Sequence, residues 1–366
     1  MGIHSTLAQY PFLLGLLSFI VGAVLMPYIV STAKKNKLIA RPNTRTSHKG
    51  NVPNIGGLAI FFAFIITYFL FSMYNLDFKE KFIVVGMCVI WLVGFYDDMA
   101  EFSSNTKFVG ELFVGLLLIV GAGVRFTHLH GFLGVGEMAD WGSYLLSFFV
   151  YLFIINAINL IDGVDGLAAG LGIVICMTFS VYFQWAGAIP LSMMAYALVG
   201  SLVIFFIYNV FGGKKKIFMG DSGSLLIGYI IYIFVVKFCE MNAYDELGSS
   251  TFLLMKAAPV FALCVLAVPL SDVIRVVITR LKQGKSPFKA DKNHVHHLLL
   301  SCKFSHKQVT FLLMGVNVGF IVLGWLIRNL KIEVAFLIFL IIVCVLFFSL
   351  WRAVDYHAGH HVDRKN

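Results

Sequence analysis

The sequence predicts an all-α protein that forms one domain over residues 1–366 and crosses a membrane about eleven times. Its composition is the first reason: 59% of the residues are hydrophobic and 13% are charged, with a mean hydropathy of +0.88. Soluble domains have roughly 45–50% apolar and about 25% charged residues. The second reason is that the apolar residues form runs of the roughly 17–25 residues that a membrane-spanning helix needs. This composition excludes a soluble globular domain.

The expected spans follow one another with short connections. The run Phe12–Val30 lacks a basic start and a small-residue cleavage site, so we expect it to stay as an anchor. The third span is short, and a Gly/Asp turn alone separates the fifth from the sixth. The spans are expected near residues 10–31, 55–74, 81–96, 108–125, 143–161, 166–184, 190–211, 221–239, 257–279, 309–328 and 332–351.

The basic residues predict the orientation of these spans. Of the 28 Lys and Arg residues, 21 lie in alternate connections on one side, which is typical of the cytoplasmic side. An odd number of spans then places the N-terminus outside and the C-terminus in the cytoplasm. The basic connections are 32–54, 97–107, 212–219, 275–307 and 352–366.

Unusual polar residues gather at the expected cytoplasmic ends of the spans. Because they come from distant parts of the chain and meet on one face, we expect the functional site there. The loops expected to form it are 32–54, 97–107, 156–170, 209–224 and 275–307.

Asp97 and Asp98 end an apolar run. Two adjacent carboxylates repel each other unless a cation or a proton lies between them, so the pair favours a divalent metal or a raised pKa. A helix-end pair that points into water is the alternative.

Asn156, Asn159, Asp162 and Asp165 recur at every third residue. On a helix each is rotated by about 60° from the last, so together they predict one drifting polar stripe. A glycine follows each aspartate and lets the backbone bend or approach a ligand closely. Amides with carboxylates suit a sugar or a base, whereas a hydrogen-bonded seam between helices is the alternative.

The segment FMGDSGS places Asp221, Ser222 and Ser224 among glycines just before a long apolar run. Free N–H groups at a helix N-terminus favour an anion, and Asp221 favours a hard metal ion with oxygen ligands. A metal held between Asp221 and a phosphate satisfies both. A simple N-cap role for Asp221 or Ser222 is the alternative.

The last basic loop ends in His294, His296 and His297. Imidazoles suit phosphate contact or proton exchange near neutral pH, although the lysines and arginines before them could also contact anionic lipid. Near the first loop, Lys49 precedes a Pro/Gly turn that could close over a site.

Together these motifs resemble the polyprenyl-phosphate N-acetylhexosamine-1-phosphate transferases, closest to the undecaprenyl-phosphate GlcNAc-1-phosphate transferase branch. The matching stretches occur in the family's order: DD at 97–98, NLIDGVDGLA at 159–168, FMGDSGS at 218–224 and SPFKADKNHVHH at 286–297. The histidine motif reads HVHH instead of the three consecutive histidines of the peptidoglycan branch. Eleven spans also agree better with the GlcNAc branch than with the ten of the peptidoglycan enzyme.

The resemblance implies a reaction in the bacterial inner membrane, with the active site facing the cytoplasm. GlcNAc-1-phosphate passes from a UDP-sugar to undecaprenyl phosphate, UMP is released, and Mg²⁺ is required, with Mn²⁺ as a substitute. The product starts a lipid-linked polysaccharide such as teichoic acid or O-antigen. The expected partners are the UDP-N-acetylhexosamine, the polyprenyl phosphate and the lipid bilayer, and no nucleic acid is expected. The exact amino sugar, the downstream polymer and a homodimer are left open.

The resemblance also implies roles for individual residues. They are Asp97, Asp98 and Asp162 in catalysis, Asp221 and Asp98 as metal ligands, Asn159, Asp162, Asp165, Asn209 and Lys49 at the nucleotide sugar, and Arg275, His294, His296 and His297 in phosphate handling.

Two other functions are the alternatives. One is a UDP-MurNAc-pentapeptide phosphotransferase of peptidoglycan synthesis. The other is an ion-coupled transporter, because acids and histidines within a membrane also mark ion paths. Transporters bind near the midplane between repeated halves, whereas these acids lie at one face and the sequence shows no repeat.

Overall fold

The computed structural model describes residues 9–36, 52–72, 77–100, 102–243, 253–284 and 294–362. Within these ranges the regular structure is helical apart from a bridge position at Pro53 and an isolated antiparallel bridge between His128 and Glu137. The all-α prediction is therefore confirmed for the described residues.

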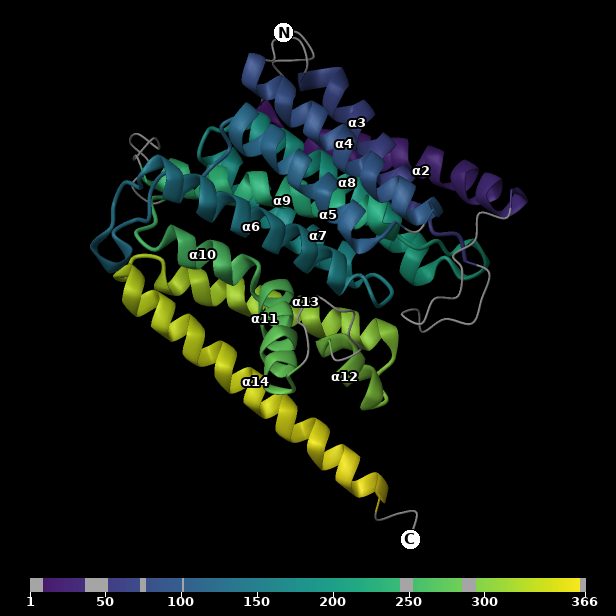
Figure 1. Cartoon of the computed structure of the whole chain (residues 1–366). Helices are drawn as coiled ribbons and strands as arrows, with labels where there is room; N and C mark the ends of the chain where they lie inside the picture. Colours follow the sequence, from purple (N-terminus) through teal and green to yellow (C-terminus); the bar gives the residue numbers. More distant parts are fainter. Residues whose placement is uncertain are drawn as a thin grey trace.

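The elements follow in chain order (Figure 1). They are α2 (Phe12–Lys35), α3 (Gly56–Ser72), α4 (Phe78–Ala100), α5 (Ser104–Gly115), the π-helical turn η2 (Leu116–Gly121), the short η3 (Phe132–Gly134), α6 (Asp140–Ile161), α7 (Leu167–Trp185), α8 (Ile189–Phe211), the short η4 (Gly213–Lys215), α9 (Gly220–Ala243), α10 (Ala258–Val265), α11 (Ala267–Lys282), α12 (Val295–Ser301), α13 (His306–Ile327) and α14 (Ile332–Val362).

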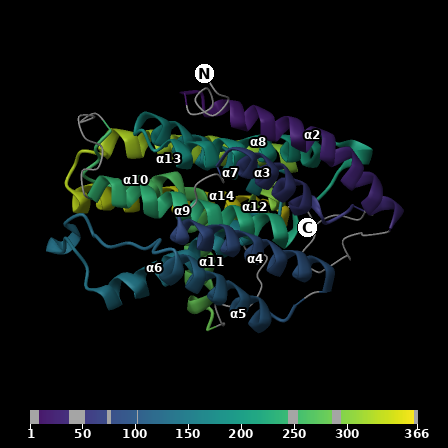
Figure 2. The ribbon, with the colours of Figure 1, turned by 90° about the horizontal axis from the view of Figure 1, so that it is seen from above.

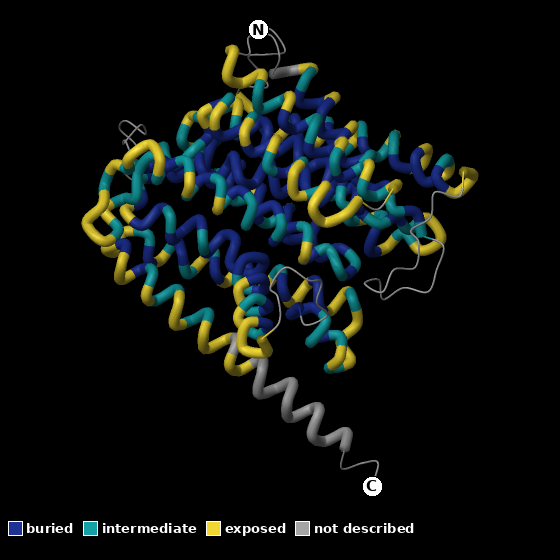
Figure 3. The backbone as a smooth tube through the Cα atoms, in the orientation of Figure 1, coloured by how far each residue is buried: buried dark blue, intermediate teal, exposed yellow. Residues whose placement is uncertain are grey.

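Helix α9 lies at the centre of the bundle. Of its most apolar window, 94% is buried inside the protein, as expected for a helix that is hydrophobic on every side. It packs against α3, α4, α6, α7 and α10, and the darkest part of Figure 3 follows this core. The N-terminus of α9 is thereby held where α4 and α6 end.

The remaining helices surround this centre. Helix α2 packs against α3 and α8, and α7 packs against α8 and α13. Helix α14 lies along one edge of the bundle in Figure 1 and behind the other helices in the view from above in Figure 2, and it contacts α10. The exposed side chains of α2, α13 and α14 include many large apolar residues, which suits helices that face lipid.

The number of membrane spans is confirmed in part. Within the described ranges, eight helices are long and apolar enough to cross a membrane, and the pair α10–α11 would make a ninth. Helices α3 and α14 add shorter apolar segments, Gly56–Leu70 and Ile332–Leu346. The sequence predicted a short third span, but α4 has 23 residues, so this prediction is wrong. Eleven spans and the orientation of the termini stay predictions.

The span expected near 257–279 is not one continuous helix, and whether the bent pair crosses the membrane stays a prediction. Helices α10 and α11 are bent by 80° at a break around Leu266, and α11 leaves the direction of its neighbours in Figure 1. Pro269 has no N–H to donate to the carbonyl of Val265, four residues earlier. Asn317 of α13 occupies the break instead: its Nδ2 donates to Val265 O at 3.0 Å, and its Oδ1 accepts from Val268 N at 3.2 Å.

Candidate active site

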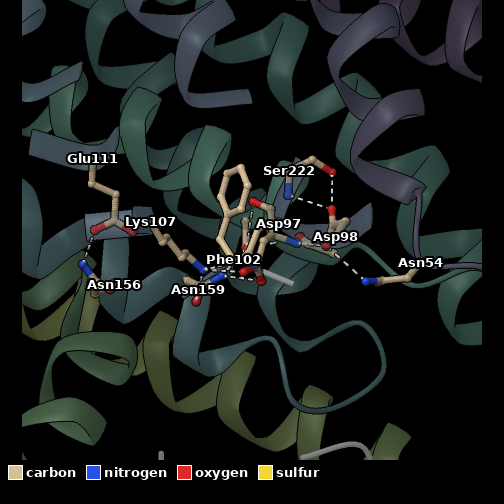
Figure 4. A network of polar contacts seen from close by, with 12 residues as sticks. Asn54, Asp97, Asp98, Phe102, Lys107, Glu111, Asn156, Asn159 and Ser222 are labelled. Atoms are coloured by element: carbon tan, nitrogen blue, oxygen red, sulfur yellow. Dashed lines mark hydrogen bonds and ion pairs between the residues drawn. The ribbon is translucent and has the colours of Figure 1, made fainter. Parts of the chain in front are cut away.

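Carboxylates from distant parts of the chain meet at one end of the bundle. Asp97 and Asp98 lie in the last turn of α4, and Asp221 lies in the first turn of α9. The backbone N–H of Asp221 donates to Asp98 Oδ1 at 2.7 Å. Figure 4 shows Asp97 and Asp98 together with Lys107, Asn159 and Ser222. The structure thus brings together residues that the sequence separates by more than 120 positions.

Asp98 caps the first turn of α9. Besides Asp221 N, its carboxylate accepts from Ser222 N at 3.0 Å, Ser222 Oγ at 2.8 Å and Asn54 Nδ2 at 3.1 Å. A carboxylate has about four lone-pair sites, so all of them are used. Asp98 of another helix therefore fills the N-cap role that the alternative interpretation gave to Asp221 or Ser222. A metal-ligand role for Asp98 stays a prediction.

Gly220 makes this close approach feasible. Its φ of +75° lies in the left-handed region, and a Cβ there would be 2.5 Å from Asp98 Oδ2. Only glycine meets both demands without strain.

Lys107 of α5 lies between Asp97 and Asp221. Its ammonium contacts Asp221 Oδ2, Asp97 Oδ2 at 3.3 Å and Asn159 Oδ1 at 3.4 Å. The sequence motifs did not indicate a role for this residue. The signal was present, because Lys107 is the one basic residue in the connection 97–107 that follows the acidic pair.

Asn159 of α6 completes the surroundings of Asp221. Its Nδ2 donates to Asp221 Oδ1 at 2.9 Å and is 2.8 Å from Ser224 Oγ. Asn156 turns to α5 instead, where its Nδ2 donates to Glu111 Oε2 at 3.0 Å. Glu111 is 2% exposed, so this contact acts as a buried seam between helices, the alternative that the sequence left open.

The predicted polar stripe does not continue past these asparagines. Helix α6 ends at Ile161, and Asp162 and Asp165 lie in the turn that leads to α7. The carboxylate of Asp165 accepts from Lys216 Nζ at 2.6 Å and lies 3.4 Å from His306 Nδ1. A single helical stripe of all four residues is therefore wrong, because the glycine-containing turn redirects the last two.

Asp162 lies close enough to the carboxylate cluster for the charges there to affect its pKa. Burial raises the pKa of its carboxyl well above the usual range, and the charges of Asp221 and Asp98 raise it further. Asp162 therefore keeps its proton to a higher pH than an exposed aspartate does.

The histidine loop reaches the same turn. A Cβ at Gly163 would be 2.3 Å from His296 Nε2, so the two segments are in direct contact. His294 and His296 are stacked with ring centroids 5.5 Å apart, and His297 lies 4.3 Å from His296. Burial and the neighbouring His297 lower the pKa of His296 to about 3, so this imidazole is neutral at pH 7.

Arg275 lies in α11 beside Asp272, with 3.3 Å between its NH2 and Asp272 Oδ1. Asp272 in turn contacts His294. Two of the predicted phosphate-handling residues, Arg275 and His294, are thus linked through a carboxylate that no sequence motif indicated.

Two residues predicted to contact the nucleotide sugar, Asn209 and Lys49, are not placed in the carboxylate site by the structure. Asn209 is 4% exposed, and its amide joins two backbone segments by accepting from Gly166 N and donating to Ile217 O at 2.7 Å. Its geometry gives it a structural role, and sugar contact stays a prediction. Lys49 lies outside the described residues.

The donor set at Asp97 and Asp221 fits a magnesium ion. Their carboxylates converge on one cation, the ammonium of Lys107, and Mg²⁺ usually binds one or two carboxylates together with substrate phosphates and water. In the described part of the chain, three or more His, Cys, Asp or Glu side chains nowhere form a ready-made metal cluster. A dedicated all-protein cage is not what Mg²⁺ requires.

A cavity of about 410 Å³ lies elsewhere, between His128, Lys256 and Lys331. Asn242, near the end of α9, also lines it, whereas Asp221 starts that helix. At 1.5 Å per residue the two ends are about 30 Å apart, so this cavity is not part of the carboxylate site.

The fold and the site define a multi-span membrane protein with clustered carboxylates at one end of its helical bundle. Comparison with known proteins identifies the class: the family described as glycosyl transferase family 4 matches residues 81–239, which contain Asp97, Lys107, Asn159 and Asp221. The chain is 30% identical over 289 residues to the undecaprenyl-phosphate alpha-N-acetylglucosaminyl 1-phosphate transferase of Yersinia pestis, covering 77% of this chain and 74% of that protein.

Two further relatives carry closely similar names. The enzyme of the same name from Escherichia coli K12 is 27% identical over 299 residues, with 81% and 78% coverage. The probable undecaprenyl-phosphate N-acetylglucosaminyl 1-phosphate transferase of Bacillus subtilis is 30% identical over 331 residues, with 90% and 88% coverage. The chain belongs to glycosyl transferase family 4, and the family resemblance seen in its motifs is confirmed.

Proposed function

We propose that this protein transfers GlcNAc-1-phosphate from UDP-GlcNAc to undecaprenyl phosphate and releases UMP. The names of its relatives support the substrates. The structural observation that carries the proposal is the convergence of Asp97 and Asp221 on Lys107 at one end of the bundle. A water-soluble nucleotide and a membrane lipid can meet at such an end.

Phosphoryl transfer depends on in-line positioning and charge neutralisation more than on covalent help from the protein. An oxygen of the lipid phosphate attacks the sugar-linked phosphorus, and the bond from that phosphorus to the bridging oxygen breaks. UMP leaves with this oxygen. The lipid phosphate, with a second pKa of about 6, is mostly dianionic at pH 7, so little proton removal is needed and Asp97 orients the acceptor or takes a residual proton.

Asp97 also takes part in holding the donor, together with the remaining residues of the site. Asp97 and Asp221 would bind Mg²⁺, or Mn²⁺ in its place, and the bound ion supplies neutralisation of the diphosphate charge. Lys107 adds a second positive charge beside them. The nucleotide sugar is contacted by Asn159, Asp162 and Asp165. The phosphate oxygens are contacted by Arg275, His294, His296 and His297.

A direct test measures UMP release from purified protein with undecaprenyl phosphate and a panel of UDP-GlcNAc, other UDP-N-acetylhexosamines and UDP-MurNAc-pentapeptide. We expect release with UDP-GlcNAc, its loss in EDTA, and recovery with added Mg²⁺. Asp221→Asn serves as the inactive but folded control. A folded wild-type protein that releases no UMP from any donor would refute the proposed function, and release from UDP-MurNAc-pentapeptide alone would favour the peptidoglycan reaction.

Direct attack also has a competitor, in which a carboxylate forms a covalent phospho-enzyme. Lipid-stripped protein is incubated with UDP-GlcNAc and labelled UMP. Direct attack predicts no exchange of label into UDP-GlcNAc without acceptor lipid. Robust exchange would establish the covalent route.

The proposed setting is the bacterial inner membrane with the site facing the cytoplasm, where the product starts a polysaccharide such as teichoic acid or O-antigen. Lys215 lies in η4 near the carboxylate end, and Leu133 lies in η3 near the other end; both are exposed. In a cysteine-free background, an impermeant maleimide added to intact spheroplasts should label Leu133→Cys and spare Lys215→Cys. The opposite labelling would reverse the orientation.

A further inference from the structure

Asp272 is a buried carboxylate in α11 with two contacts at the start of α12. It is 1% exposed. Its Oδ2 lies 2.9 Å from His294 Nδ1, and its Oδ1 accepts from Val295 N at 2.7 Å. A buried charge is costly unless it is paired and hydrogen-bonded, and these contacts together with Arg275 satisfy both conditions.

The pairing determines how His294 presents its ring. A carboxylate at Nδ1 selects the form in which that nitrogen carries the hydrogen, so Nε2 is left for another group. The bond to Val295 N also fixes the backbone next to the histidine. Asp272 therefore sets both the orientation of the ring and its tautomer.

The position of His294 affects the other histidines and, through them, the turn near the carboxylate cluster. The ring of His294 is parallel to that of His296 within 3°, and His296 Nε2 lies against Gly163, next to Asp162. A shift of His294 would therefore change the packing of the loop on the turn that holds Asp162.

We infer that Asp272 is a positioning residue for phosphoryl transfer, which holds His294 with Nδ1–H toward the carboxylate, so that Nε2 is free to accept the residual proton of a substrate phosphate and then to donate to its oxygen. It acts through His294 and does not itself contact the substrates. The inference rests on the proposed function, in which His294 handles phosphate.

The first experiment compares Asp272→Asn with Asp272→Glu in steady-state assays of UMP release. The amide of Asn keeps the shape but can turn its NH₂ to Nδ1 and select the other tautomer. We expect kcat to fall by about 10²-fold or more, as for other groups that orient a histidine, while KM for UDP-GlcNAc changes by less than about 3-fold. Asp272→Glu keeps the carboxylate and should recover at least about 10-fold of the lost kcat.

The second experiment is a double-mutant cycle with His294→Gln. If Asp272 acts through His294, adding Asp272→Asn to His294→Gln should lower kcat by less than about 3-fold further. The neighbouring Ser271→Ala is the matched control, because the Ser271 hydroxyl bonds to the backbone of its own helix at Ala267 and Val268. It should change kcat by less than about 3-fold. Thermal melting of every variant reports folding.

The outcomes separate the two claims. A folded wild-type protein that releases no UMP contradicts the proposed function. If the wild type is active and the kcat losses of Asp272→Asn and His294→Gln multiply in the double variant, the positioning role is overturned and the proposed function stands. A glutamate variant that is folded and no more active than Asp272→Asn also overturns it. Should Asp272→Asn fail to fold, the folded Asp272→Glu variant replaces it in the cycle and must show the same non-additivity.

Discussion

Asp98 holds Ser222 by two hydrogen bonds, one from the backbone N–H at 3.0 Å and one from the hydroxyl at 2.8 Å, both to Oδ2. The carboxylate of α4 thereby satisfies free N–H groups at the positive end of α9. Because α9 runs through the centre of the bundle, this contact determines where Asp221 lies relative to α4. The acidic pair and the FMGDSGS segment form one site through this cap.

Replacing Asp98 with asparagine tests the cap apart from any metal. An amide offers one acceptor oxygen and turns two N–H donors toward the donors of α9. Hydrogen bonds to charged groups contribute about 1.5–3 kcal/mol each, so we expect Asp98→Asn to lower the melting temperature in EDTA as well as in Mg²⁺. A melting temperature that falls only when Mg²⁺ is present would make Asp98 a metal ligand instead of a cap. Ser222→Ala, which loses one bond of the four, is the milder control.

Gly220→Ala should disrupt the same contact from the other side. The new methyl group would lie 2.5 Å from Asp98 Oδ2, in addition to a left-handed strain of about 1–2 kcal/mol. Gly213→Ala is the matched control, because Gly213 also has a positive φ of 51° but no atom within 4 Å of its added Cβ. Gly220→Ala should lower both stability and kcat, and Gly213→Ala should lower stability slightly. Equal effects on the two would show that the contact with Asp98 is unimportant.

Lys107→Met should abolish most of the activity while leaving the fold intact. The methionine keeps the length of the side chain but leaves Asp97 and Asp221 without their shared ammonium. Removing one hydrogen-bond donor that stabilises a transition state costs about 10²–10³-fold in kcat, and we expect a loss of that order here. Lys215→Met, at an exposed lysine of η4 near the same end, should retain activity. A Lys107→Met protein with wild-type kcat would remove this residue from the site.

The sequence was sufficient to predict the helical class and the convergence of Asp97, Asp98 and Asp221, because long apolar runs and their polar ends carry that information. It did not reveal the break between α10 and α11. Pro269 was visible, but the partner that takes over the freed backbone groups, Asn317, lies about 50 residues away. Tertiary contacts of this kind have no local signature.

The same limit explains the errors within the site. A three-residue period predicted one stripe from Asn156 to Asp165, but the turn after Ile161 overrides helical periodicity. Asp272 was missed because it lies in a stretch whose local pattern is that of an ordinary helix, and Lys107 was missed because a lysine in a connection is typical of the cytoplasmic side. Their roles depend on carboxylates or imidazoles supplied by other helices.

Asn209 gives a test between a structural role and sugar contact. Its amide joins Gly166 N to Ile217 O, so Asn209→Leu leaves two buried backbone groups without partners, at about 1–3 kcal/mol each. We expect a lower melting temperature, with KM for UDP-GlcNAc of the folded fraction changed by less than about 3-fold. A KM raised by 10-fold or more at unchanged stability would support contact with the nucleotide sugar.

The low pKa of His296 predicts how stability responds to acid. Its folded-state pKa of about 3 lies below the unfolded value of about 6.5, so the unfolded chain binds the extra proton between these values. Stability from this group is complete above pH 6.5 and is lost as pH falls toward 3, at up to about 1.4 kcal/mol per pH unit. The groups that face the ring are His297, His294, Asp272 and Arg275, and of these Asp272 opposes the lowered pKa.

His296→Gln cannot take up the proton, so its melting temperature in detergent should fall less steeply than that of the wild type between pH 6.5 and 4.5. His297→Gln is the control for general loss of an imidazole from the loop. Parallel melting curves for wild type and His296→Gln would show that His296 is not held neutral in the folded protein.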